Sequence, residues 1–314
     1  GSGTEADNAA IKGLFWHSSK KVIVVSSIEH HAVLDAAHWL VEHEDAELIE
    51  IPVNVDGVID LQFLQSIVTQ RSSEIALISI MHSNNETGVI QPIAEVVKIA
   101  GEIPVHCDAV QSFTKVPLSF KDLGLFAMTI SGHKVGGPLG IGALILRRAV
   151  EIPALLHGGG QERDIRSGTL NAPSIVAFAT AVEAHLYDAA HVASLRDSFE
   201  TGVLATRSDA VINGKNAPRL PGISNITFPG TQSDSLLLLM DAQKVSCSTG
   251  AACTAGVHRP SHVLMAMGLS DVLSQSSLRF SFGITNTQAD VAYALSVLPD
   301  VIERGLAANA VGKK

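Results

Sequence analysis

Lys134 stands where a lysine amine can do covalent chemistry. It lies in the segment SGHKVGGPLG, directly after the apolar run FAMTI. The glycines around it let a bulky group approach the backbone. A lysine amine that desolvation or a nearby cation keeps partly neutral can form an imine with an aldehyde. Taken alone, a Lys-Gly pairing is more often an exposed lysine in a loop.

Asp108 follows a second apolar strand, in the segment HCDAVQ. The carboxyl ends of parallel strands meet at one edge of a sheet, so we expect Asp108 and Lys134 to lie at the same edge. A carboxylate there can keep a pyridine nitrogen protonated, which makes pyridoxal phosphate an electron sink. A lone aspartate would more often cap a strand-to-helix turn. The two residues together, in this order, indicate the pyridoxal-phosphate cofactor.

The elements that must position these residues alternate along the chain. Short β-branched runs alternate with longer helical stretches from residue 22 to about residue 147. This pattern predicts an α/β fold with a mostly parallel sheet, helices on both faces and ligands beyond the carboxyl ends of the strands. This alternation ends after a helical segment from Ser174 to about Thr206. From there a strand-like run, ISNITF, precedes a long Ser/Gly/Thr-rich stretch and a final helix. We therefore expect a large domain over residues 1–195 and a smaller C-terminal α/β domain over residues 196–314.

The composition excludes several classes of protein. With 46% hydrophobic and 17% charged residues in 314, the chain is globular. No apolar run approaches the ~20 residues of a membrane helix, and a net charge of -9 leaves no basic excess for nucleic acid. Three cysteines without paired spacing argue against disulfides and a metal site, and favour a reducing, cytoplasmic location. The first residues lack signal-peptide features, so we expect the native start further upstream.

Eight segments resemble, in order, successive motifs of the cysteine desulfurases. They are GTEADN, SIEHHAV, MHSNNETGVIQPI, HCDAVQS, SGHKVGGPLG, HGGGQERDIRSGTLN, STGAACTAG and SSLRFSFG. Together they are far more specific than any single Gly-rich loop. The resemblance implies the pyridoxal-phosphate transferase fold type I and conversion of L-cysteine to L-alanine, with the sulfur left on an enzyme cysteine as a persulfide. The chain lacks the RxGHxCxxP pattern and so resembles the long-loop group, which serves iron–sulfur scaffolds and tRNA-thiolating enzymes.

The resemblance also assigns the cofactor site. It makes Lys134 the imine-forming lysine and the base, Asp108 the partner of the pyridine nitrogen, and His30 the residue stacked on the ring. The other cofactor contacts that it implies are Gly3, Thr4, Asn85, Gln111, Ser131, His133 and Thr169. Thr169 resembles a residue that reaches a phosphate in the neighbouring subunit, which implies a homodimer.

Cys253 is the nucleophile that the resemblance implies. It lies among small residues in STGAACTAG, which suits a loop that moves between substrate and acceptor. Cys247 lacks that context, and Cys107 falls in a strand as a small buried hydrophobe would. Arg279 resembles the arginine that grips the substrate carboxylate, and Asn85 the asparagine near the substrate.

Some features depart from the family pattern. Leu139 stands where many members have lysine, Ala251 where serine is frequent and Ile284 where arginine often follows. Several dozen residues that members carry at the front are also absent. The alternatives are a selenocysteine lyase, another pyridoxal-phosphate lyase or transaminase of the same fold, or a non-catalytic interaction protein that retains the fold.

Overall fold

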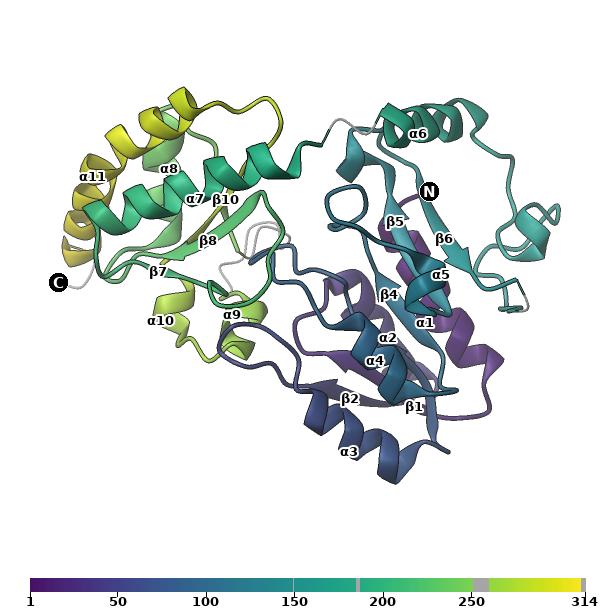
Figure 1. Ribbon diagram of the computed structural model, residues 1–314. Coiled ribbons are helices and arrows are strands. Elements are labelled where there is room, and N and C mark those ends of the chain that lie inside the picture. The colour runs from purple at the N-terminus through teal and green to yellow at the C-terminus, as the bar shows by residue number, and fades with distance from the viewer. Residues whose placement is uncertain (149, 185–186, 251–259, 312–314) are drawn as a thin grey trace. The chain divides into compact units, whose positions relative to one another are not determined.

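The computed structural model describes residues 1–148, 150–184, 187–250 and 260–311 (Figure 1). The chain forms two compact units. Unit 1 comprises Gly1–Pro52, Ile59–Asn84 and Gln91–His185, and unit 2 comprises Val53–Val58, Asn85–Ile90 and Leu186–Lys314. Unit 2 therefore includes two short stretches from the first third of the chain.

Unit 1 contains a six-stranded sheet in the order β2-β1-β3-β4-β5-β6. The strands are β1 (Val22–Ser26), β2 (Glu47–Ile51), β3 (Ile75–Ser79), β4 (Val105–Asp108), β5 (Ala127–Ser131) and β6 (Gly142–Leu146). All neighbours pair in parallel except β5 and β6, which are antiparallel. The connection between those two is shorter than the roughly dozen residues that a parallel crossover needs. The predicted α/β fold with a mostly parallel sheet is confirmed.

The inner strands of this sheet are covered on both faces. Strands β1, β3, β4 and β5 are buried at every position, whereas the edge strands β2 and β6 are only partly buried. Unbroken runs of Val, Ile and Ala suit such strands, since both faces of a parallel sheet pack against helices. Polar residues can therefore cluster at the edge formed by the carboxyl ends of the inner strands.

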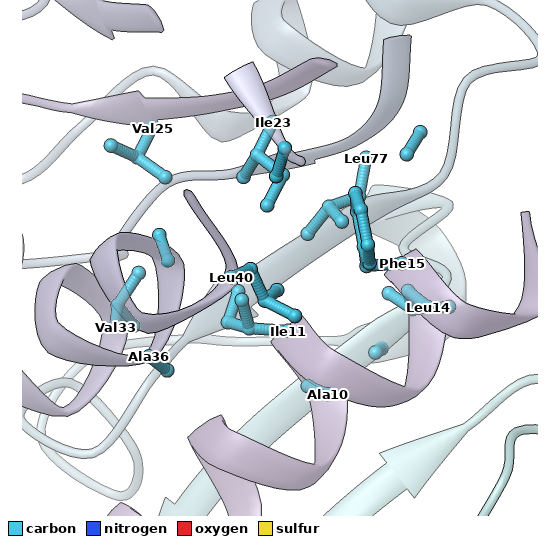
Figure 2. Close-up of a cluster of buried hydrophobic side chains, with 14 of the residues drawn as sticks. Ala10, Ile11, Leu14, Phe15, Ile23, Val25, Val33, Ala36, Leu40 and Leu77 are labelled. Carbon is cyan, nitrogen blue, oxygen red and sulfur yellow. The ribbon is translucent and has the colours of Figure 1, made fainter. Parts of the chain in front are cut away.

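Helices α1 (Gly3–His17) and α2 (His31–His43) pack together and form one core of unit 1 with the sheet. In Figure 2, Ile11, Leu14 and Phe15 of α1 belong to one cluster of buried side chains, in which Ile11 lies beside Leu40 of α2 and Phe15 beside Leu77 of β3. The spacing of three and four residues puts the α1 side chains on one helix face. The remaining helices and 3-10 turns of unit 1 are α3 (Leu61–Arg71), α4 (Ile93–Ala100), α5 (Phe120–Leu123), η1 (Gly132–Val135), η2 (Glu162–Asp164) and α6 (Ala172–Ala184).

Unit 2 contains an antiparallel sheet in the order β7-β8-β10-β9. Its strands are β7 (Val211–Ile212), β8 (Ile223–Thr227), β9 (Ser248–Thr249) and β10 (Ser277–Ser281). Its helices are α7 (Ala189–Thr206), α8 (Ser233–Ala242), α9 (His262–Ala266), α10 (Asp271–Ser274) and α11 (Gln288–Val311). The ring of Phe199 on α7 lies 4.7 Å from Phe280 and 5.6 Å from Phe282, which anchors the helix to the sheet.

Main-chain hydrogen bonds join the 85–90 stretch to the rest of unit 2. The Ile90 amide donates to the Pro218 carbonyl at 2.8 Å, and the Leu220 amide donates to the Gly88 carbonyl at 2.8 Å. This pairing explains why a stretch between two sheet elements of unit 1 belongs to unit 2. Among the described helices, none is long and apolar enough to span a bilayer.

Candidate active site

Two neighbouring strands of unit 1 end in the residues that the sequence indicates for chemistry. Strand β4 ends at Asp108, and β5 ends at Ser131, directly before the η1 turn that holds Lys134. The Lys134 charge lowers the pKa of Asp108, so the two side chains lie within electrostatic reach. His30, also in unit 1, caps α2 through its Nδ1, which accepts from the Ala32 amide at 3.1 Å.

Asp108 is the buried anion of this edge. Its side chain is 6% exposed, and one carboxylate oxygen accepts a hydrogen bond from the Val110 amide at 2.8 Å. Burial raises the pKa of Asp108, while the Val110 hydrogen bond and the Lys134 charge act against that rise. A cationic ring nitrogen would offset the desolvation of this carboxylate. The site therefore suits a protonated pyridine.

Further buried ionisable groups, which the sequence reasoning missed, surround Asp108. His106 receives or donates hydrogen bonds at both ring nitrogens, with Ser79 Oγ at 2.8 Å from Nδ1 and Thr129 Oγ1 at 3.0 Å from Nε2. Asp7 Oδ1 lies 3.6 Å from His106 Nε2, close enough for an ion pair. However, burial lowers the pKa of His106 to about 3, and burial and the Asp108 charge raise the pKa of Asp7. Both shifts disfavour the charged forms and so oppose an ion pair between the two side chains.

The sequence carries a signal for one of these two residues. Positions 106 and 108 lie on one face of a strand because side chains alternate, so HCDAVQ places His106 beside Asp108. Asp7 lies in GTEADN, which reads as a helix cap when taken alone. Only the packing of α1 against β4 brings it to the same place.

The first turn of α1 forms a close-packed cradle beside this edge. A Cβ added at Gly3 would lie 3.0 Å from Val110 Cγ2 and 3.3 Å from Ser131 Cβ. A Cβ at Gly142 would lie 2.7 Å from the Ser2 carbonyl carbon. The two glycines thus let the first turn of α1 pack closely against β5 and β6. This packing brings the amides of a helix N-terminus to the edge where Asp108 lies, an arrangement that favours phosphate and so suits pyridoxal phosphate.

The other predicted cofactor residues of unit 1 differ in exposure. Thr4, His133 and Lys134 are exposed, and Ser131 Oγ lies 2.9 Å from His133 Nδ1. Gln111 is partly buried, and its Oε1 accepts from Lys115 Nζ at 3.2 Å.

Thr169 is exposed. It lines a cavity of about 540 Å³ in unit 1 together with Glu5, Arg166 and residues of β6 and α6. Neither Lys134 nor Asp108 lines that cavity. Among the described residues, Thr169 therefore lines a cavity to which neither Asp108 nor Lys134 contributes.

The predicted substrate residues lie together in unit 2. Arg279 on β10 donates from Nη1 to the Asn85 carbonyl oxygen at 2.9 Å, and its buried Nε has no hydrogen-bond partner among the described residues. A half-buried guanidinium with donors to spare can hold a carboxylate.

Of the three family departures, Leu139 is 79% exposed and Ile284 is 41% exposed. Ala251 lies outside the described residues, as does Cys253. The structure therefore does not place the predicted nucleophile.

The two described cysteines are both held as thiols. Cys107 is fully buried, and burial with the nearby acidic groups raises its pKa well above the ordinary value. Burial and the Asp241 charge raise the pKa of Cys247 to about 11. The thiolate is the nucleophilic form of cysteine, so neither residue suits nucleophilic chemistry near neutral pH. In the described residues, no group of three or more His, Cys, Asp or Glu side chains could hold a metal ion.

Comparison with known proteins agrees with this geometry. Residues 1–293 match the aminotransferase class-V family. The chain is 47% identical over 314 residues to an IscS-like cysteine desulfurase of Mycobacterium tuberculosis, covering 96% of this chain and 80% of that protein. It is 42% identical over 310 residues to the cysteine desulfurase IscS of Methanosarcina thermophila, covering 96% and 76%.

Solved structures show the same fold. A NifS-like protein superposes with a TM-score of 0.87 at 32% identity, covering 96% of this chain and 81% of the other. SspA in complex with cysteine superposes with a TM-score of 0.77 at 33% identity, covering 90% and 79%. Fold and comparisons define an enzyme of the pyridoxal-phosphate fold type I. Within that class, the chain belongs to the cysteine desulfurases of the aminotransferase class-V family. The family expected from the sequence motifs is confirmed.

Proposed function

We propose that this cysteine desulfurase binds pyridoxal phosphate through Lys134, Asp108 and the cradle at the start of α1. The observation that carries the proposal is the buried Asp108 carboxylate at the end of β4, within reach of the Lys134 charge. His30 is proposed to stack on the ring, and Gln111 to donate to its hydroxyl. The proposed phosphate contacts are Gly3, Thr4, Ser131 and His133, with Asn85 near the cofactor and substrate.

The cofactor, when bound, supplies an electron sink for the Cα–H bond of the substrate. Lys134 anchors the cofactor and, once released, its neutral amine takes the Cα proton of L-cysteine. Asp108 stays ionised and holds the proton on the ring nitrogen. Arg279 orients the substrate by binding its carboxylate, in a fork that a guanidinium matches.

Cys253 is proposed to take the sulfur. Its thiolate attacks the sulfur of L-cysteine, so an S–S bond forms while the C–S bond breaks. The electron pair of that bond stays with the substrate carbon, which gains a proton and leaves as part of L-alanine. The high pKa values of the Cys107 and Cys247 thiols support this choice.

Two measurements test the proposal. The protein reconstituted with pyridoxal phosphate should form L-alanine from L-cysteine, and borohydride reduction followed by peptide mapping should place the cofactor on Lys134. Cofactor label on another lysine would overturn the site assignment. Absence of alanine from a yellow, folded protein would overturn the reaction.

We further propose that the protein works as a homodimer, in which Thr169 reaches the partner's phosphate site. Apolar side chains next to Thr169 support this: Leu170 is 46% exposed, and Ile175 and Val176 on α6 are 41% and 65% exposed. Exposed apolar side chains that come close together in sequence favour an interaction surface here. Val176→Glu should give monomers in sedimentation, whereas Leu238→Glu, at an exposed position on α8, should leave the dimer intact.

The sulfur acceptor is proposed to be an iron–sulfur scaffold or a tRNA-thiolating enzyme in the cytoplasm. The relatives from Mycobacterium tuberculosis and Methanosarcina thermophila are named IscS-like and IscS, and these names together with the long-loop motif around Cys253 support an acceptor protein. Incubation with labelled L-cysteine and each purified acceptor should move label to one of them. Label that stays on the desulfurase with both acceptors would contradict this part.

A further inference from the structure

Glu86 is a buried acid of unit 2 that the proposed reaction does not use. Its side chain is 4% exposed, and its carbonyl oxygen accepts from the Asn225 side-chain amide at 3.3 Å. Asn225 is fully buried on β8 and is held by the Asn213 amide at 2.7 Å. Glu86 is thus fixed to the middle of the unit 2 sheet. Burying an ionisable side chain costs free energy, so the presence of Glu86 at this buried position needs a physical explanation.

The Glu86 carboxyl group meets the chain on both sides of residues 251–259. Ser261 Oγ donates to Glu86 Oε2 at 2.5 Å. Gly250 lies so close that an added Cβ would stand 2.5 Å from the same oxygen and 3.1 Å from Ser261 Cβ. The described residues that flank the Cys253 segment therefore converge on one carboxyl oxygen.

Each flank is itself anchored. Ser261 is 4% exposed, its amide donates to Ser274 Oγ at 3.0 Å, and its hydroxyl accepts from the Leu264 amide at 3.1 Å as the cap of α9. Gly250 directly follows β9, in which Ser248 pairs with Arg279 of β10. The Ser261 hydroxyl thus donates its one proton to Glu86 while it accepts from the helix that it caps.

Glu86 also lies beside the proposed substrate arginine. It follows Asn85, whose carbonyl oxygen accepts from Arg279 Nη1, and the Arg279 charge acts on its carboxyl group. One short stretch of chain therefore contacts both the arginine and the flanks of the segment that contains the nucleophile.

We propose that Glu86 is a positioning residue, whose carboxyl group fixes Gly250 and Ser261 together and so sets where the Cys253 segment starts and ends relative to Arg279. The inference rests on the proposed function, in which Arg279 holds the substrate and Cys253 attacks its sulfur. A displacement on the order of 1 Å in such a group can cost about a hundredfold in rate. Glu86 then acts only on the sulfur step, since removal of the Cα proton uses Lys134.

The test compares Glu86→Ala with Glu86→Gln in the pyridoxal-phosphate holoenzyme. Glutamine keeps an oxygen that can accept from Ser261, and alanine does not. Two rates are measured with L-cysteine: exchange of the Cα proton with solvent and formation of L-alanine. For Glu86→Ala we expect alanine formation to fall about tenfold or more, with proton exchange within about twofold of the parent. Glu86→Gln should recover most of the lost rate.

Two serine variants provide a matched comparison. Ser261→Ala removes the donor to Glu86 and should reproduce the split between the two rates. Ser270→Ala removes only the cap of α10, where Ser270 Oγ accepts from the Leu273 amide at 3.4 Å, and should change neither rate by much. Alanine formation at the parent rate in Glu86→Ala would overturn the inference. Equal loss of both rates would overturn it too, since it would indicate a general loss of folding. If the proposed function fails, the parent itself shows no alanine formation.

Discussion

The buried carboxyl group of Glu86 should cost the protein stability as the pH rises. Burial raises the pKa of Glu86 from 4.5 to about 7, against the Ser261 hydrogen bond and the Arg279 charge. Each pKa unit corresponds to about 1.4 kcal/mol, so the whole difference amounts to about 3 kcal/mol. Because the folded state has the higher pKa, the contribution is fully present below the unfolded pKa and is lost as the pH rises through 7. Glu86 therefore destabilises the folded state most when its carboxyl group is ionised.

The variant Glu86→Gln isolates this effect, since glutamine has nearly the same shape and does not ionise. Its free energy of unfolding relative to the parent should grow by about 2 to 3 kcal/mol between about pH 5 and about pH 8.5. Urea unfolding without added cofactor, followed by far-ultraviolet circular dichroism, measures the difference.

The two units can be told apart in this experiment. Both tryptophans, Trp16 and Trp39, belong to unit 1, so the part of the transition that tryptophan fluorescence does not follow reports unit 2. Glu303→Gln, at an exposed position of α11, is the control and should show no comparable pH dependence. A Glu86→Gln difference that stays flat with pH, or falls as the pH rises, would refute the reasoning.

Three further variants and one control variant address the reaction and the cofactor. Cys253→Ser should keep the yellow cofactor and the exchange of the Cα proton but form almost no alanine, and release of alanine at the parent rate would show that the nucleophile is misassigned. Cys247→Ser should retain the parent rate of alanine formation, since its thiol is largely protonated. Gly142→Ala forces a Cβ against the Ser2 main chain, so it should weaken cofactor binding at least severalfold, measured by titration of the visible band, with an overpacking cost of about 1–3 kcal/mol in unfolding. Gly283→Ala, with its nearest neighbour atom 3.9 Å away, should bind cofactor like the parent.

The sequence predicts the part of the site that depends on strand ends. Asp108 and Lys134 each follow an apolar run, and adjacent parallel strands bring their ends to one edge, so local pattern and topology suffice. These positions require only the order of elements and the two-residue period of a strand.

The remaining groups depend on packing that no local pattern encodes. Asp7 reaches the neighbourhood of Asp108 only because α1 lies on the sheet. Glu86 meets Ser261 across 175 positions of sequence, and the motif NNETG gives no sign of it. The role of Cys253 stays a prediction from its sequence motif. The division into domains at residue 195 stays a prediction from the change in sequence pattern along the chain.

Unit 2 is assembled from three separate stretches of chain, and this has a consequence for how the protein can be made. Residues Val53–Val58 and Asn85–Ile90 leave the ribosome well before the sheet that they join. They must wait, with Glu86 and its neighbours solvated, until β8 and β10 have been synthesised. A fragment that begins at Leu186 would carry all four strands of that sheet yet lack the partner of Ser261. Such a fragment should therefore fold less stably than unit 2 does in the whole chain. Co-expression with the preceding part of the chain would supply the missing stretches in trans.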